Sequence, residues 1–148
     1  MNHRELIAQI RFQLSTLRDR NEHHAFEHLC RKYARVRICS NILPATGPVA
    51  AGGDQGRDFE TFRTLLQTEI KRTSTFVGAG SSAEAIAFAC TTQLYSSGLS
   101  AKILADVAKI MESGTQVDSI YFFCTEAIPA AKQHELRDKV RHEHAIEL

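Results

Sequence analysis

Acidic side chains stand in the segment GGDQGRDFETF, residues 52–62, where a glycine-rich stretch leads into an alternating apolar run. The period-two alternation of a strand would place Asp58 and Glu60 on one face. Two carboxylates on one face could reach one divalent cation, because hard cations prefer oxygen ligands. The competing interpretation is a solvated turn before an edge strand, and the segment alone leaves both open.

Two nucleotide-binding motifs do not fit this glycine-rich segment. A phosphate loop of the GxxxxGK[ST] kind needs a lysine after its last glycine and leads into a helix. Here the glycines lead into a predicted strand and no such lysine follows. The GxGxxG dinucleotide fingerprint fails because it also requires a helix at that point.

A second polar group ends the apolar run AIAFACTTQ, residues 85–93. Strand alternation would place Ala89, Thr91 and Gln93 on one face. The polar end of this face could therefore line the same site as Asp58. Alternatively, these groups cap the following helix or bond to a loop.

The elements that must position these residues follow from hydrophobic periodicity and from glycine and proline breaks. Helices are predicted at 3–18, 22–34, 101–113 and 129–144, the last one opened by Pro129. Strands are predicted at 36–43, 57–66, 85–93 and 117–128, with a short fifth strand at 145–148, and residues 68–85 read as a polar loop. This order predicts a three-layer α/β fold with a central mixed sheet of about five strands flanked by helices.

Composition narrows the class of protein. The chain has 148 residues, 43% of them hydrophobic, which suits one domain over residues 1–148. A formal charge of +1 offers no overall basic surplus for nucleic acid, so polyanion binding would need a local cluster, such as Arg31, Lys32, Arg35 and Arg37. Four cysteines without a CxxC pair predict free thiols in a reducing compartment. With neither a secretory segment nor a membrane-spanning run in this sequence, we expect a soluble cytoplasmic protein.

The succession of FEHLCRKY, PATG, GGDQGRDFETF, FACTTQ, LSAKI and IYFFCTEAIPAAKQHEL, from about residue 20 onward, resembles the PD-(D/E)xK nuclease superfamily. It is most similar to the Mrr-like branch, found as N-terminal effector domains of multidomain bacterial defence proteins. The resemblance implies a restriction-endonuclease-like fold. It also implies that the chain is the N-terminal part of a longer protein.

The resemblance assigns roles to individual residues. Asp58 matches the strand-end aspartate that is the main divalent-metal ligand, and Glu27 matches an acidic residue of the first helix. Glu60 is expected to join Asp58 as a metal ligand because strand alternation places both on one face. Where the family has E-x-K, this chain has Ala89-Cys90-Thr91. The substitutes we expect are Gln93, as a neutral metal ligand, and Lys102, as a cation from the next helix.

The implied activity is hydrolysis of DNA by an endonuclease that uses Mg²⁺ or Mn²⁺, and we expect the DNA to be double-stranded. Implied partners are DNA, sensor or oligomerisation domains beyond residue 148, and further copies of the chain. The rival hypothesis is a catalytically degenerate nuclease fold that serves as a nucleic-acid-binding or protein-interaction module, because E-x-K is absent. A small-molecule enzyme is a third option, but no nucleophile motif supports it.

Simpler roles compete for the same side chains. Lys102 lies at helical spacing with Asp106 and Lys109 and could form an ordinary surface ion pair. Glu27 could pair with Arg31, its i+4 neighbour. Zinc binding by His24 and His28 is disfavoured, because a structural zinc site usually needs four ligands.

Overall fold

A computed structural model describes residues 2–44, 56–61, 84–112 and 116–148. Its sheet contains four strands, where about five were predicted. They are β1 (Ile42–Pro44), β2 (Phe59–Thr61), β3 (Ile86–Thr91) and β4 (Ser119–Cys124). The α-helices are α1 (His3–Asp19), α2 (His23–Arg37), α4 (Leu99–Glu112) and α5 (Ala130–His144), and a short 3₁₀ helix, η2, covers Tyr95–Ser97.

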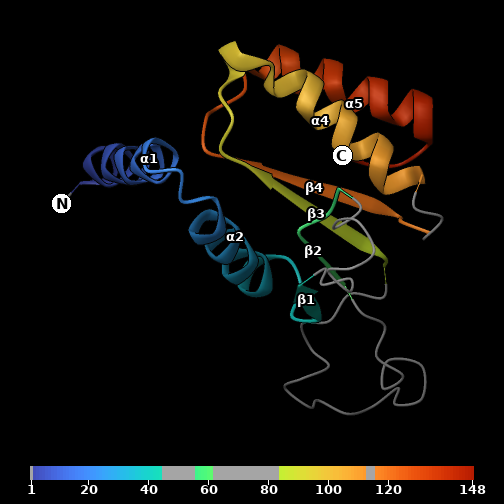
Figure 1. The fold of residues 1–148 in the computed structure, drawn as a ribbon, viewed down its shortest axis with the longest axis horizontal. Coiled ribbons are helices and arrows are strands. Elements are labelled where there is room, and N and C mark those ends of the chain that lie inside the picture. Colours follow the sequence, from blue (N-terminus) through green and yellow to red (C-terminus); the bar gives the residue numbers. More distant parts are fainter. Residues whose placement is uncertain (1, 45–55, 62–83, 113–115) are drawn as a thin grey trace.

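The strands lie in the order β1-β2-β3-β4. The first two pairings are antiparallel, and β3 pairs with β4 in parallel, in register from Ile86 opposite Ser119 to Thr91 opposite Cys124. Helix α4 makes the crossover between the two parallel strands (Figure 1). The chain is therefore an α/β protein with a mixed sheet, as predicted.

Strand β3 is the centre of the core. Its side chains alternate, so Ala87 and Ala89 pack with α4 and α5 while Ile86 and Phe88 pack with α2. All four side chains are buried. Helices therefore flank the sheet on both faces, with α4 and α5 together on one of them (Figure 1).

Helices α1 and α2 are separated by a break at residues 20–22, in agreement with the predicted helices at 3–18 and 22–34. Helix α1 begins with a capping box between Asn2 and Glu5, and Asn21 adopts the left-handed conformation, with φ of 58°, between the two helices. An asparagine tolerates this conformation better than most residues. Figure 1 shows α1 extending away from the sheet beyond α2.

Helix α2 is longer than predicted. It continues to Arg37, so the strand predicted at 36–43 is limited to its last part, beginning at Ile42. The buried stripe of the helix consists of Phe26, Cys30 and Ala34, at i, i+4 and i+8. Burial of Ala34 holds the last turns against the sheet, and this contact overrides the strand propensity of the residues that follow.

The predicted fifth strand, residues 145–148, forms only a single bridge between Ser119 and Glu147. The residues from 62 to 66 of the predicted second strand, and most of the polar loop at 68–85, lie outside the described residues. Within the described part of the chain, none of the helices combines the length and the apolar character that crossing a bilayer requires.

Candidate functional site

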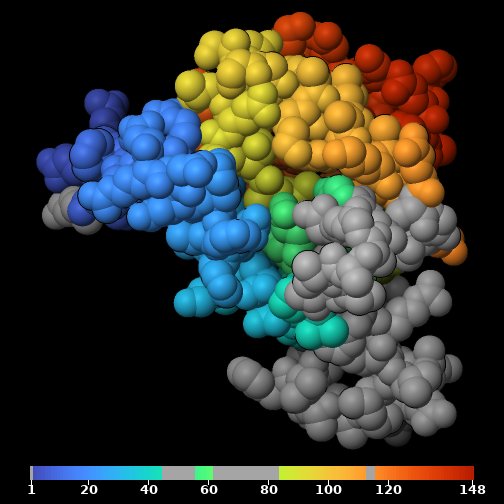
Figure 2. Space-filling view, viewed as in Figure 1, coloured from blue at the N-terminus to red at the C-terminus, as the bar shows by residue number. Residues whose placement is uncertain are grey.

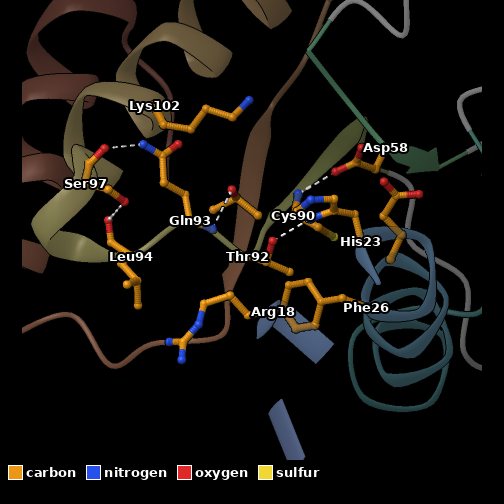
Figure 3. A pocket seen from close by; sticks show the side chains of 12 residues that line it. Arg18, His23, Phe26, Asp58, Cys90, Thr92, Gln93, Leu94, Ser97 and Lys102 are labelled. Atoms are coloured by element: carbon orange, nitrogen blue, oxygen red, sulfur yellow. Dashed lines mark hydrogen bonds between the residues drawn. The ribbon is translucent and has the colours of Figure 1, made fainter. Parts of the chain in front are cut away.

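A cavity of about 590 Å³ opens at the C-terminal end of β3, between α2, the approach to β2 and the start of α4 (Figure 3). It brings together four of the five predicted site residues: Glu27, Asp58, Gln93 and Lys102. The remaining lining residues are Arg18, His23, Phe26, Cys90, Thr91, Thr92, Leu94 and Ser97.

Asp58 is fixed against β3 by two hydrogen bonds. Its backbone N–H donates to the Phe88 carbonyl oxygen at 2.9 Å, and its carboxylate oxygen Oδ2 accepts the backbone N–H of Cys90 at 2.5 Å. Asp58 itself lies just before β2 begins. The sequence predicts that this strand begins at residue 57, whereas Asp58 lies just before the observed strand and not within it.

The glycine at position 56, two residues before Asp58, is required for steric reasons. Gly56 has φ of +81°, and a Cβ added there would lie 2.9 Å from the carbonyl oxygen of Asp106 in α4. Only glycine suits both the left-handed backbone and so close an approach. The turn that leads into β2 is thereby held against the helix that carries Lys102.

Gln93 lies in the segment that links β3 to α4. Its backbone N–H donates to the Thr91 hydroxyl at 3.2 Å, and its side-chain nitrogen donates to the Ser97 carbonyl oxygen. Because the amide nitrogen is engaged with Ser97, the amide oxygen is the atom of this side chain suited to binding a cation. Gln93 thus bonds to the loop, as one alternative held, and also lines the cavity that contains Asp58, while its role as a metal ligand stays a prediction.

Lys102 lines the cavity from the first turn of α4 and also forms the ion pair expected of a helix stripe. Its Nζ lies 2.7 Å from a carboxylate oxygen of Asp106. The Asp106 side chain is only 5% exposed, whereas that of Lys102 is 40% exposed. The pair therefore presents its cation, not its anion, to the cavity side.

Glu27 reaches the cavity from α2. One of its carboxylate oxygens lies 3.2 Å from Nδ1 of His24, while Arg31 contacts His28 at 2.7 Å. The predicted pairing of Glu27 with Arg31 is therefore not the arrangement found. Arg35, another member of the predicted basic cluster, donates two hydrogen bonds to the Ile42 carbonyl oxygen and so joins α2 to β1.

Glu60 does not reach this cavity. Its carboxylate accepts a hydrogen bond from Nη1 of the buried Arg57 at 2.6 Å, and both residues line a different cavity, with Thr61 and Ile86. The predicted common face fails because Asp58 precedes β2, and strand alternation applies only once the strand has begun at Phe59. The structure thus separates Glu60 from Asp58.

The pKa of Cys90 is raised by its surroundings in the cavity. A hydrogen bond with the Cys30 thiol raises its pKa most, burial raises it further, and the nearby charges of Asp58 and Glu27 add to the effect. Cys90 therefore stays a neutral thiol, which argues against a nucleophilic role. Asp58 and Glu27 both line the cavity at this end of β3, and two carboxylates so placed would stabilise a cation.

His23 and Arg18 also line the cavity, and sequence reasoning missed both. Nδ1 of His23 lies 2.5 Å from the hydroxyl of Thr92, which is buried (Figure 3). The two residues are 69 positions apart, so no local spacing could reveal the contact. For Arg18, the available signal was its place in the last turn of the first helix.

The donor atoms at the site suit a hard divalent cation. Asp58 and Glu27 provide carboxylates, and Gln93 provides an amide oxygen. Among the described residues, no three or more His, Cys, Asp and Glu side chains are grouped to hold a metal, so an all-protein cage is not present there. Mg²⁺ commonly binds through one or two carboxylates and retains several water ligands, so Asp58 and Glu27 are the residues that would hold it.

Comparison of the chain with protein-family models, with curated proteins and with solved structures found no match.

Proposed function

We propose that this chain is a metal-dependent endonuclease domain that hydrolyses phosphodiester bonds of double-stranded DNA. The observation that carries the proposal is the meeting of Asp58, Gln93 and Lys102 with Glu27 in one cavity, although they come from four separate segments. The mixed sheet with its β3-α4-β4 crossover supports the restriction-endonuclease-like fold that the sequence resemblance implies. A role as the effector of a larger bacterial anti-phage protein is proposed from that resemblance alone.

In this proposal the chain's own residues have distinct tasks. Asp58, which is hydrogen-bonded to β3, would bind Mg²⁺ or Mn²⁺ together with Glu27 and the Gln93 amide oxygen. The bound ion would polarise the phosphoryl group and lower the pKa of the attacking water. Lys102, on the cavity side of its pair with Asp106, would stabilise negative charge that develops on the phosphate.

The test is cleavage of supercoiled plasmid in Mg²⁺, Mn²⁺ or EDTA. We expect the wild type to nick plasmid only with metal, and Asp58→Asn to lose on the order of a hundredfold or more in rate, because the charge that holds the ion is gone. Asp118→Asn is the matched control, since Asp118 accepts the Ala85 N–H at 2.8 Å at the opposite end of β3. Equal rates for both variants would refute the assignment of Asp58.

The alternative function is a catalytically degenerate nucleic-acid-binding module. The observation that favours it is the engagement of Lys102 with the buried Asp106, together with Ala89 and Thr91 where the family has E-x-K. Binding of duplex DNA that is equal in EDTA and Mg²⁺, unaffected by Asp58→Asn and without cleavage, would select this alternative.

A further inference from the structure

The N-terminal helices carry a charge that the rest of the chain does not. Residues 3–37 hold eight Lys and Arg against four Asp and Glu, whereas the remainder holds ten against thirteen. The net charge of +1 for the whole chain therefore includes a basic region, residues 3–37, which lies beside the cavity. Such a local excess attracts polyanions even when the net charge is small.

Three arginines of this region form one row along α1. Arg4, Arg11 and Arg18 are spaced by seven residues, so successive members are displaced by only about 20° around the helix. At a rise of 1.5 Å per residue, the row is about 21 Å long. Arg18, at its end, lines the cavity that holds Asp58 (Figure 3).

The row is accessible. Helix α1 has no buried residue, and Arg4 and Arg11 are exposed. Within the described residues neither of them forms an ion pair, and Arg18 pairs only with the adjacent Asp19, whose side chain is 63% exposed. An exposed pair of this kind is weak, so a phosphate can replace Asp19 as the partner of Arg18.

The face of α1 next to the row fixes the helix to the body of the protein. Leu14 and Leu17 pack against the core cluster around Phe26 and Phe88. Figure 2 shows α1 at one edge of the molecule, with the surface of α2 beside it. The C-terminal part of α1, which carries Arg18, is therefore packed against the body of the protein.

We propose that the row formed by Arg4, Arg11 and Arg18 is a track for the phosphate backbone of the duplex that enters the cavity. This inference rests on the proposed nuclease function, because it assigns the flanking DNA of that substrate to α1. The length of the row corresponds to about six base pairs at 3.4 Å per pair. Nucleic acid is favoured over an anionic membrane because the row leads into the cavity of Asp58 and Glu27, where a flat lipid surface could not follow.

The experiment compares Arg4→Gln/Arg11→Gln with Lys132→Gln/Lys139→Gln, a control on α5 that removes the same two charges. Both control lysines pair with glutamates of α5, and that helix covers the other side of the sheet from α2. Fluorescence anisotropy would measure binding of a labelled duplex of about 30 base pairs in EDTA over a range of salt concentrations. Arg18 stays intact in both variants because it lines the cavity.

We expect the α1 variant to bind roughly 60-fold more weakly than the wild type at 0.1 M salt and nearly equally at 1 M, with its salt slope reduced by about two. The control should retain the wild-type slope. A wild type that binds and cleaves DNA, with an α1 variant indistinguishable from the control, would overturn the track and leave the nuclease function standing.

Different results would refute the nuclease function and the phosphate track together. A wild type that neither binds the duplex nor cleaves plasmid would overturn the nuclease function and the track together. Binding to phosphatidylserine vesicles instead, lost in the α1 variant, would assign the row to a membrane surface and also overturn the track.

Discussion

The two ends of β3 are built from similar parts but present different charges. At each end a carboxylate accepts a backbone N–H: Asp58 accepts that of Cys90 within β3, and Asp118 accepts that of Ala85, the residue before β3. Each end also has a cation–carboxylate pair, Arg57 with Glu60 near the N-terminal end and Lys102 with Asp106 near the C-terminal end.

The two ion pairs differ in which of their members, the cation or the carboxylate, is buried. In the first pair the cation is buried, with the Arg57 side chain 4% exposed and that of Glu60 42% exposed. In the second the carboxylate is buried, with Asp106 at 5% and Lys102 at 40%. A carboxylate that accepts a backbone N–H is thus common to both ends of β3 and does not mark a functional site. The C-terminal end differs because an accessible lysine, Lys102, shares a cavity with Asp58 and Glu27 there.

The largest expected effect is on the rate of plasmid cleavage when the accessible Lys102 loses its charge. Lys102→Gln should reduce plasmid cleavage by on the order of a hundredfold, because a charge that stabilises the reacting phosphate is lost. Lys109→Gln, in the same helix and outside the cavity, should cleave near the wild-type rate. Similar loss in both variants would mean that the charge of α4, not the position of Lys102, matters.

Neutralising one carboxylate at each end should separate metal binding from stability. Glu27→Gln should weaken Mn²⁺ binding by about tenfold, measured by calorimetry, and leave the urea midpoint unchanged. Glu60→Gln should leave Mn²⁺ binding unchanged and lower the free energy of unfolding by about 1–2 kcal/mol, because the buried Arg57 loses a charged partner. If both variants had the same effect, the two ends would not differ in function.

The smallest expected effect is the change in the free energy of unfolding that follows ionisation of the buried thiols. Burial raises the pKa of Cys39, and the Cys30 thiol raises that of Cys90, both from an ordinary value of 9.0. A raised pKa in the folded state favours the neutral thiol, so the stabilisation is complete below pH 9 and is lost as pH rises above it. Urea unfolding at pH 8 and pH 10 should show this loss, and Cys90→Ser should make it smaller. An equal loss in the variant would contradict the shift at Cys90.

The sequence predicted the parts of the fold and site that depend on local pattern. The burial of β3 and the helix that carries Lys102 follow from periodicity and breaks within a few residues. Asp58 is expected inside a strand that begins at residue 57, but it lies just before β2. The path of Glu60 could not be predicted, because it depends on where β2 begins and on the buried guanidinium of Arg57. The same holds for the end of α2, which packing of Ala34 decides.

The hydrogen bond from the Cys90 amide to Asp58 also provides a spectroscopic reporter. An amide proton donated to a carboxylate resonates downfield, and its chemical shift responds when the charge of that carboxylate is compensated. In a ¹H–¹⁵N spectrum the Cys90 cross-peak would therefore follow occupation of the site. The Ala85 cross-peak, whose amide donates to Asp118 just before the other end of β3, would serve as an internal reference.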